Sequence, residues 1–173
     1  LFGQKVDRAK AYLHLIEKYF PQYVQELIGQ AQGLGLSILE LWTLSLEEEA
    51  DFLDPPSDHC TTVITNDGSL LGHTEDEDPG WENSVVILRK ELQDFSVLEL
   101  YFLGTLGGTS VTVNSHGIVS TRNTLADYGT QFGIPRGTLA RFLSETKNPE
   151  LPETKKKFVD LDEDYHSPAL ITH

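Results

Sequence analysis

Cys60 is the only cysteine among the 173 residues of the chain, and it begins an extended, β-branched run that ends at Thr65. A thiolate is the reactive form of cysteine, but a free thiol has a pKa of about 8.5, so a base must assist it near neutral pH. The α-amine of an N-terminal cysteine can be that base, because its pKa is about 7.7–8.0. Attack of the thiol on the carbonyl carbon of His59 would form a thioester, and hydrolysis of that thioester by water would cut the chain before Cys60 and leave its α-amine free.

A β-hairpin is predicted to follow Cys60. The sequence Asn66-Asp67-Gly68 provides the positive φ angles of a tight, two-residue turn, and the chain then returns through residues 69–73. The returning strand leads into the acidic residues 75–78, so we expect Asp76 to lie beside Cys60. Taken alone, the same pattern also fits a buried structural cysteine and a solvated acidic loop.

The stretch from His59 to Asp76 resembles the nucleophile hairpin of the acyl-coenzyme A:isopenicillin N acyltransferase-like family. Its members are autoproteolytic enzymes of the N-terminal-nucleophile (Ntn) hydrolase superfamily, related to choloylglycine and penicillin V acylases. Within the hairpin, the resemblance depends on Cys60, Thr61, Gly68, Gly72 and Asp76. It extends over about residues 58–145, through the blocks Tyr101–Gly108, Val113–Ile118, Ser120–Leu125 and Gly133–Arg136.

The resemblance implies roles for three catalytic residues. Cys60 would be the nucleophile, and Asp76 would orient the new α-ammonium group or a substrate amine. Asn123 would donate a side-chain N–H to the oxyanion of the tetrahedral intermediate. As an alternative, Asn123 is an ordinary turn residue at a strand end. The family has glycine before the nucleophile, whereas this chain has His59, which makes cleavage between His59 and Cys60 a point to test.

Two further residues are candidate substrate contacts. His73 occupies the position of a substrate-facing arginine in related bile-salt hydrolases, and Arg122 is a candidate contact for an anion. Their alternative interpretations are a structural histidine and a surface charge. The six histidines of the chain show no metal-ligand spacing, and residues 75–78 lack the full pattern of a calcium loop. We therefore expect neither a metal nor another cofactor.

Helices are predicted before Cys60 and strands after it. Apolar residues recur every three or four positions over residues 4–32, with a break at Pro21, and again from Ser37 to Phe52. After a proline-rich linker, the pattern changes to a period of two residues. We expect strands near residues 60–65, 69–74, 84–90, 97–103, 109–113 and 117–122, and one more helix at 135–146.

This order of elements predicts an α+β fold. The resemblance specifies it as the αββα four-layer sandwich of Ntn hydrolases. We expect that sandwich to be incomplete here, because family members are usually longer and the chain lacks methionine. The length suits a single domain, residues 1–173. Within it, residues 1–59 would be a helical pro-segment that stays bound after cleavage as a non-covalent partner, and residues 60–173 the β-rich part.

Composition restricts the partners. The formal net charge of −14 would repel a phosphate backbone, so nucleic acid is not expected to bind, and no apolar run is long enough to cross a membrane. The absence of a signal-peptide pattern at Leu1 favours a cytoplasmic location over secretion.

Our leading hypothesis is an amidohydrolase or acyltransferase that acts on a small linear or cyclic amide, or another acyl donor, through a Cys60 thioester. The alternatives are an inactive Ntn-fold homologue that binds a ligand or partner, and a plain α+β structural domain.

Overall fold

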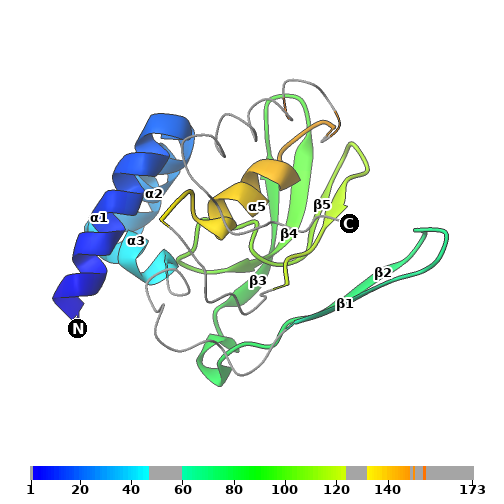
Figure 1. Cartoon of the computed structure of the whole chain (residues 1–173), viewed down its shortest axis with the longest axis horizontal. Helices are drawn as coiled ribbons and strands as arrows, with labels where there is room; N and C mark the ends of the chain where they lie inside the picture. Colours follow the sequence, from blue (N-terminus) through cyan, green and yellow to red (C-terminus); the bar gives the residue numbers. More distant parts are fainter. Residues whose placement is uncertain (1, 47–59, 124–131, 149, 151–153, 155–173) are drawn as a thin grey trace.

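The computed structural model describes residues 2–46, 60–123, 132–148, 150 and 154, and the predicted linker and His59 lie outside these ranges. Figure 1 shows three helices at one end of the molecule: α1 (Phe2–Tyr19), α2 (Pro21–Leu34) and α3 (Ile38–Ser45). A four-stranded sheet follows, with helix α5 (Arg136–Ser144) against it. The hairpin of β1 (Thr61–Ile64) and β2 (Leu71–Thr74) projects away from this body. The combination of helices and antiparallel strands confirms the predicted α+β class.

Local sequence signals set the boundaries of the helices. Pro21 is the first residue of α2, where its missing N–H costs nothing, and Gly35 ends that helix at a φ of 70°. Ser37 and Glu40 form a reciprocal capping box at the start of α3. Helix α3 ends at Ser45, earlier than predicted, and the remainder of the predicted helix lies outside the described residues. None of the helices in the described ranges is long and apolar enough to cross a membrane.

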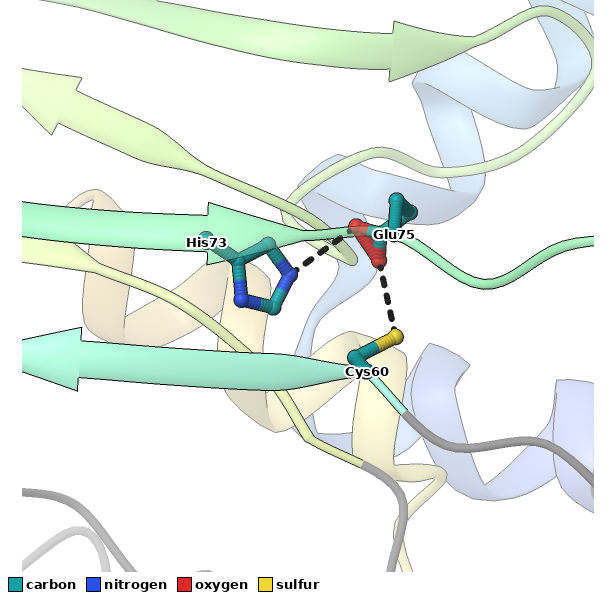
Figure 2. Close-up of side chains that lie close together, drawn as sticks. All are labelled: Cys60, His73 and Glu75. Atoms are coloured by element: carbon teal, nitrogen blue, oxygen red, sulfur yellow. Dashed lines mark hydrogen bonds and ion pairs between the residues drawn. The ribbon is translucent and has the colours of Figure 1, made fainter.

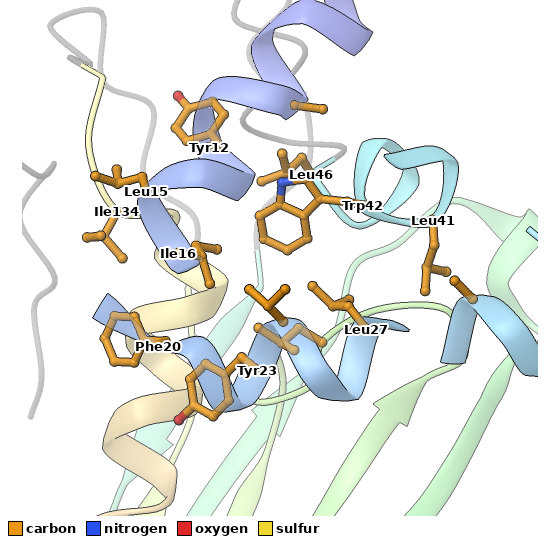
Figure 3. Packing of buried hydrophobic residues seen from close by; sticks show 14 of the residues in the cluster. Tyr12, Leu15, Ile16, Phe20, Tyr23, Leu27, Leu41, Trp42, Leu46 and Ile134 are labelled. Atoms are coloured by element: carbon orange, nitrogen blue, oxygen red, sulfur yellow. The ribbon is translucent and has the colours of Figure 1, made fainter. Parts of the chain in front are cut away.

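The hydrophobic core lies mainly among the three N-terminal helices (Figure 3). The side chains of Ile16, Phe20, Leu27 and Trp42 are at most 2% exposed. The cluster also contains Leu106, Ile134 and Leu139, which come from the chain after Cys60. The core therefore joins the helices that precede the cysteine to the part that follows it.

The larger sheet has the strand order β3-β4-β5-β6, and every neighbouring pair is antiparallel. Its strands are β3 (Val85–Glu91), β4 (Ser96–Phe102), β5 (Thr112–Asn114) and β6 (Val119–Ser120), and a short 3-10 helix η1 (Pro79–Trp81) precedes them. Strands β5 and β6 are shorter than predicted, and Gly117 makes the turn between them at a φ of 87°.

The two faces of this sheet differ in character. Alternation along the strands places Glu99, Thr112 and Asn114 on one face, all of them buried, and the Asn114 amide donates to main-chain oxygens at the end of α5. The opposite face carries apolar side chains that remain accessible. They are Ile87, Leu98, Val113 and Val119, with exposures of 76%, 47%, 40% and 43%.

Buried ions connect the helices to the sheet. Arg141 of α5 contacts Glu26 of α2 at 2.6 Å and Glu145 at 2.7 Å, and it also donates to the main-chain oxygen of Leu106. Glu99 accepts the main-chain N–H of Gly108 at 2.7 Å, which holds the loop after β4 against the same helix. These contacts fix α5 between the N-terminal helices and the sheet.

The turn of the β1–β2 hairpin differs from the prediction. The loop spans residues 66–69, closed by the hydrogen bond from the Thr65 N–H to the Leu70 oxygen at 3.0 Å. Gly68 alone within this loop has a positive φ, at 71°. Asp67 instead accepts the main-chain N–H of Ser69 at 3.1 Å and the Thr65 hydroxyl at 2.7 Å. These hydrogen bonds stabilise a loop of four residues. The register of the two strands is still that of a turn centred on Asp67 and Gly68.

Candidate active site

The register of the hairpin decides which side chains face Cys60. Thr61 pairs with Thr74 and Thr62 with His73, so the next position outward places Glu75 opposite Cys60. Side chains alternate between the faces of a strand pair, and so Cys60, Thr62, His73 and Glu75 share one face. Figure 2 shows the side chains of Cys60, His73 and Glu75 converging across the two strands.

The Cys60 thiol is half-buried and contacts a carboxylate. Its Sγ lies 3.5 Å from Glu75 Oε1, as donor to an acceptor. Burial raises the pKa of the Cys60 thiol above its ordinary value, the main-chain N–H of Asp76 acts against that increase, and the negative charge of Glu75 adds to it. The thiol therefore stays protonated near neutral pH and needs a base before it can attack.

Glu75 is held by a histidine and a serine as well as by the thiol. His73 Nε2 lies 3.1 Å from Glu75 Oε2, and the two side chains are 1% and 14% exposed. The hydroxyl of Ser110, which is itself buried, donates to the same carboxylate oxygen. Three contacts of this kind leave the carboxylate little freedom to turn, so its orientation towards the thiol is fixed.

A second chain of hydrogen bonds leads from His73 to Asn123. Thr62 Oγ1 lies 2.9 Å from His73 Nδ1 and donates to Asn123 Oδ1 at 2.6 Å. The Asn123 amide then donates to the main-chain oxygen of Cys60 at 2.6 Å. Asn123 follows strand β6 and is 63 residues from Cys60 in sequence, so the sheet brings it to the head of the hairpin.

The structure brings together three of the residues singled out in the sequence, namely Cys60, His73 and Asn123. Asp76 adjoins the thiol through its main chain, whereas its exposed side chain belongs to the other face of the hairpin. The Arg122 side chain extends towards Gly137 in the first turn of α5. The catalytic and substrate-binding roles of these five residues stay predictions, and His59 lies outside the described residues.

Sequence reasoning did not identify Glu75, Thr62 or Ser110. The signal for Glu75 is in the sequence, because a turn centred on Asp67 and Gly68 pairs residues outward until Glu75 meets Cys60. No local signal exists for Ser110, whose contact depends on how the hairpin meets the larger sheet. Cys60, His73 and Glu75 also have potential metal-ligand atoms within 4.8 Å of one another, although the histidine spacing predicted no metal.

Comparisons with known proteins agree with the resemblance found in the sequence. Residues 63–168, more than half of the chain, match the family described as acyl-coenzyme A:6-aminopenicillanic acid acyl-transferase. The beta-alanyl-dopamine/carcinine hydrolase of Drosophila melanogaster is 32% identical over 154 residues, which cover 77% of this chain and 40% of that protein. The chain thus spans less than half the length of this curated relative, and no solved structure matches it. On these matches, the chain belongs to the acyl-coenzyme A:6-aminopenicillanic acid acyl-transferase family.

Proposed function

We propose that this chain carries the catalytic thiol of an Ntn amidohydrolase or acyltransferase, which is activated by cleavage before Cys60. The observation that carries the proposal is the contact between Asn123 and Cys60, at 2.6 Å from the side-chain amide to the main-chain oxygen. A side-chain amide donates hydrogen bonds without titrating, so it can be in place before negative charge develops beside the nucleophile. Membership of an acyl-transferase family supports the same class of reaction.

The proposed maturation step uses the thiol that later performs catalysis. Cys60 Sγ attacks the carbonyl carbon of His59, the bond from that carbon to the Cys60 nitrogen breaks, and the proton lost by sulfur ends on the new amine. Water then hydrolyses the thioester and releases residue 59 as a carboxylate. The free α-amine of Cys60 now supplies the base that a thiol of raised pKa requires. Asp76 would orient that amine.

In turnover, the same thiol would take the acyl group from an amide substrate and release its amine. The relative is named as a hydrolase of beta-alanyl-dopamine and carcinine. A β-alanyl group carries an ammonium ion, and the acidic residues 75–78 follow the strand that faces Cys60. We therefore propose β-alanyl amides of small amines as substrates. Hydrolysis and transfer differ only in whether water or a second amine attacks the thioester.

We further propose that the sheet described here is one of the two central layers of an αββα sandwich. The accessible apolar face, which includes Ile87 and Leu98, supports this arrangement, because a second sheet would cover it. In this scheme residues 1–173 belong to one domain. Residues 1–59 are the helical pro-segment, and residues 60–173 begin with the nucleophile.

The experiment measures cleavage and amide turnover separately. Mass spectrometry of the denatured chain should show two fragments that meet between His59 and Cys60, and Cys60→Ala should leave the chain intact. The cleaved chain should release dopamine from beta-alanyl-dopamine, while Cys60→Ala should not. Ser57→Ala, two residues before His59, is the matched control, and it should cleave and release dopamine as the parent does.

The outcomes discriminate between the alternatives. Release of dopamine by Cys60→Ala at the parent rate would rule out the cysteine as nucleophile. An intact parent chain that binds beta-alanyl-dopamine without hydrolysing it would identify an inactive homologue with a binding role. A chain that neither cleaves nor binds would leave only the structural interpretation of Cys60.

A further inference from the structure

We propose that Cys60, His73 and Glu75 form a binding site for a divalent cation of the zinc type, and that the bound ion blocks the thiol. The three side chains lie on one face of the β1–β2 hairpin, where the strand register brings them together (Figure 2). Sulfur, imidazole nitrogen and carboxylate oxygen are the ligand atoms that Zn²⁺ prefers. Ca²⁺ and Mg²⁺ prefer oxygen alone and would not select this set.

The separations between the ligand atoms suit such an ion. Zn²⁺ binds sulfur at about 2.3 Å and nitrogen or oxygen at about 2.0–2.2 Å, so two ligand atoms of a tetrahedral site lie about 3.4–3.6 Å apart. In this chain, Cys60 Sγ is 3.5 Å from one Glu75 oxygen, and His73 Nε2 is 3.1 Å from the other. All three ligand atoms lie within 4.8 Å of one another. The ligand atoms are therefore already close to the spacing that the ion requires.

Surrounding hydrogen bonds orient the histidine for this role. Thr62 gives its single hydroxyl hydrogen to Asn123 Oδ1 at 2.6 Å, so its oxygen accepts the N–H of His73 Nδ1 at 2.9 Å. Nε2, which donates to Glu75 in the metal-free chain, is then the ring nitrogen left for the ion, and a bound ion would take the place of the proton there. Histidine ligands of metals commonly have such a donor contact at the other ring nitrogen. With a side chain only 1% exposed, His73 has few other directions in which to turn.

The remaining contacts favour a cation in the same place. Ser110 donates to the Glu75 oxygen that faces His73 and so orients the carboxylate, as outer partners of metal ligands do. Glu77 adds negative charge near the thiol. Three protein ligands would leave the fourth position of a tetrahedral ion open to water. The blocking effect depends on the proposed function of Cys60, whereas ion binding does not, because it requires only side chains of the uncleaved chain.

The experiment titrates Zn²⁺ into the metal-free chain and follows binding by calorimetry. We expect one ion per chain. His73→Asn and Glu75→Gln should each weaken binding more than tenfold, because even the loss of an outer partner costs about 10- to 100-fold. The matched controls are His14→Asn on the exposed side of α1 and Glu82→Gln after η1, and both should bind as the parent does.

Two further measurements use the unaltered chain and therefore do not depend on how a variant folds. Co²⁺ should produce the charge-transfer absorption of a metal–thiolate bond, and Zn²⁺ should protect Cys60 from iodoacetamide until a chelator is added. Absence of both signals would overturn the proposal. Parent-like binding by folded His73→Asn and Glu75→Gln would also overturn it, since the thiol alone would then hold the ion. A chain that binds Zn²⁺ but never cleaves before Cys60 would contradict the maturation step and leave the metal site standing.

Discussion

The side-chain amide of Asn123 donates a hydrogen bond to the main-chain oxygen of Cys60 across 63 residues of sequence, at 2.6 Å. If the amide later turns to the oxyanion, Asn123→Ala should lower the turnover of an amide substrate by about a hundredfold to a thousandfold. KM should change little, because the lost bond forms only in the transition state. Steady-state kinetics on beta-alanyl-dopamine measures both quantities.

The matched control for this substitution is Asn66→Ala, at the exposed tip of the hairpin. It should retain the parent kcat and KM. A purely structural role for Asn123 would give a different pattern, in which Asn123→Ala raises KM and lowers the thermal stability of the chain together. That pattern would contradict the assignment of an oxyanion donor.

Replacing Glu75 should make the Cys60 thiol more reactive near neutral pH. Burial raises the thiol pKa most, and the negative charges of Glu75 and Glu77 raise it further, so Glu75→Gln removes the contribution of Glu75 and lowers that pKa. A lower pKa gives a larger thiolate fraction at pH 7, and iodoacetamide should therefore alkylate the variant faster than the parent. The pH at half-maximal alkylation rate, measured with a chelator present, should move downward.

Glu82→Gln provides the control for this experiment, because it removes a negative charge that is not among the charges near the thiol. Its alkylation profile should match that of the parent. An unchanged profile for Glu75→Gln would show that Glu75 has little effect on the thiol pKa in spite of the contact at 3.5 Å.

The helices could be predicted from sequence because their signals are local. Periodic apolar residues and the caps at Gly35 and Ser37 act within a few positions, and the structure has both caps. The strands of the hairpin were also predictable, but the turn was assigned two residues. The side chain of Asp67 accepts the Ser69 N–H and the Thr65 hydroxyl, and these bonds favour a wider loop over the two-residue turn.

The site was harder to predict because it depends on register and on contacts between distant strands. The returning hairpin and the family resemblance selected Asp76, whereas the register of the strands places Glu75 opposite Cys60. Ser110 reaches Glu75 from 35 residues away, and such a contact has no local signature. Asn123 was identified through family resemblance and not from its own surroundings in the sequence.

Gly108 should be the glycine least tolerant of substitution in the described part of the chain. Its φ is +74°, and a Cβ atom there would lie 2.4 Å from the Arg141 Cα. The left-handed conformation alone costs about 1–2 kcal/mol for an alanine, and the clash with a helix backbone adds to it. We expect Gly108→Ala to lower the free energy of unfolding, measured in urea, by more than about 2 kcal/mol.

Gly29→Ala is the opposite case and serves as the control. Gly29 lies inside α2, and nothing is within 4 Å of the position its Cβ would occupy. Alanine is favoured over glycine in a helix by about 0.5–1 kcal/mol, so this variant should be slightly more stable than the parent. Equal stability of the two variants would show that the loop at Gly108 can move away from α5.

The contacts between the helices before Cys60 and the chain after it are extensive. Arg141 donates to both carboxylate oxygens of Glu26, at 2.9 and 2.6 Å, and the Tyr23 hydroxyl donates to Glu145 at 2.9 Å. The Ser45 hydroxyl donates to the Gly104 oxygen at 2.7 Å. Together with the shared hydrophobic core, these bonds predict that a cut between the two parts will not release the helices.

A protease site in place of residues 55–58 tests this expectation without relying on self-cleavage. After proteolysis, the two pieces should elute together on gel filtration and separate only in denaturant. Arg141→Ala should weaken the association, because Glu26 would lose its ion pair across the two parts and Glu145 would keep only its contact with Lys90. Lys147→Ala, which removes an exposed ion pair with Asp94, should have no comparable effect. Separation of the parent pieces without denaturant would contradict the idea that residues 1–59 stay bound as a partner, since the core would then be too weak to hold them.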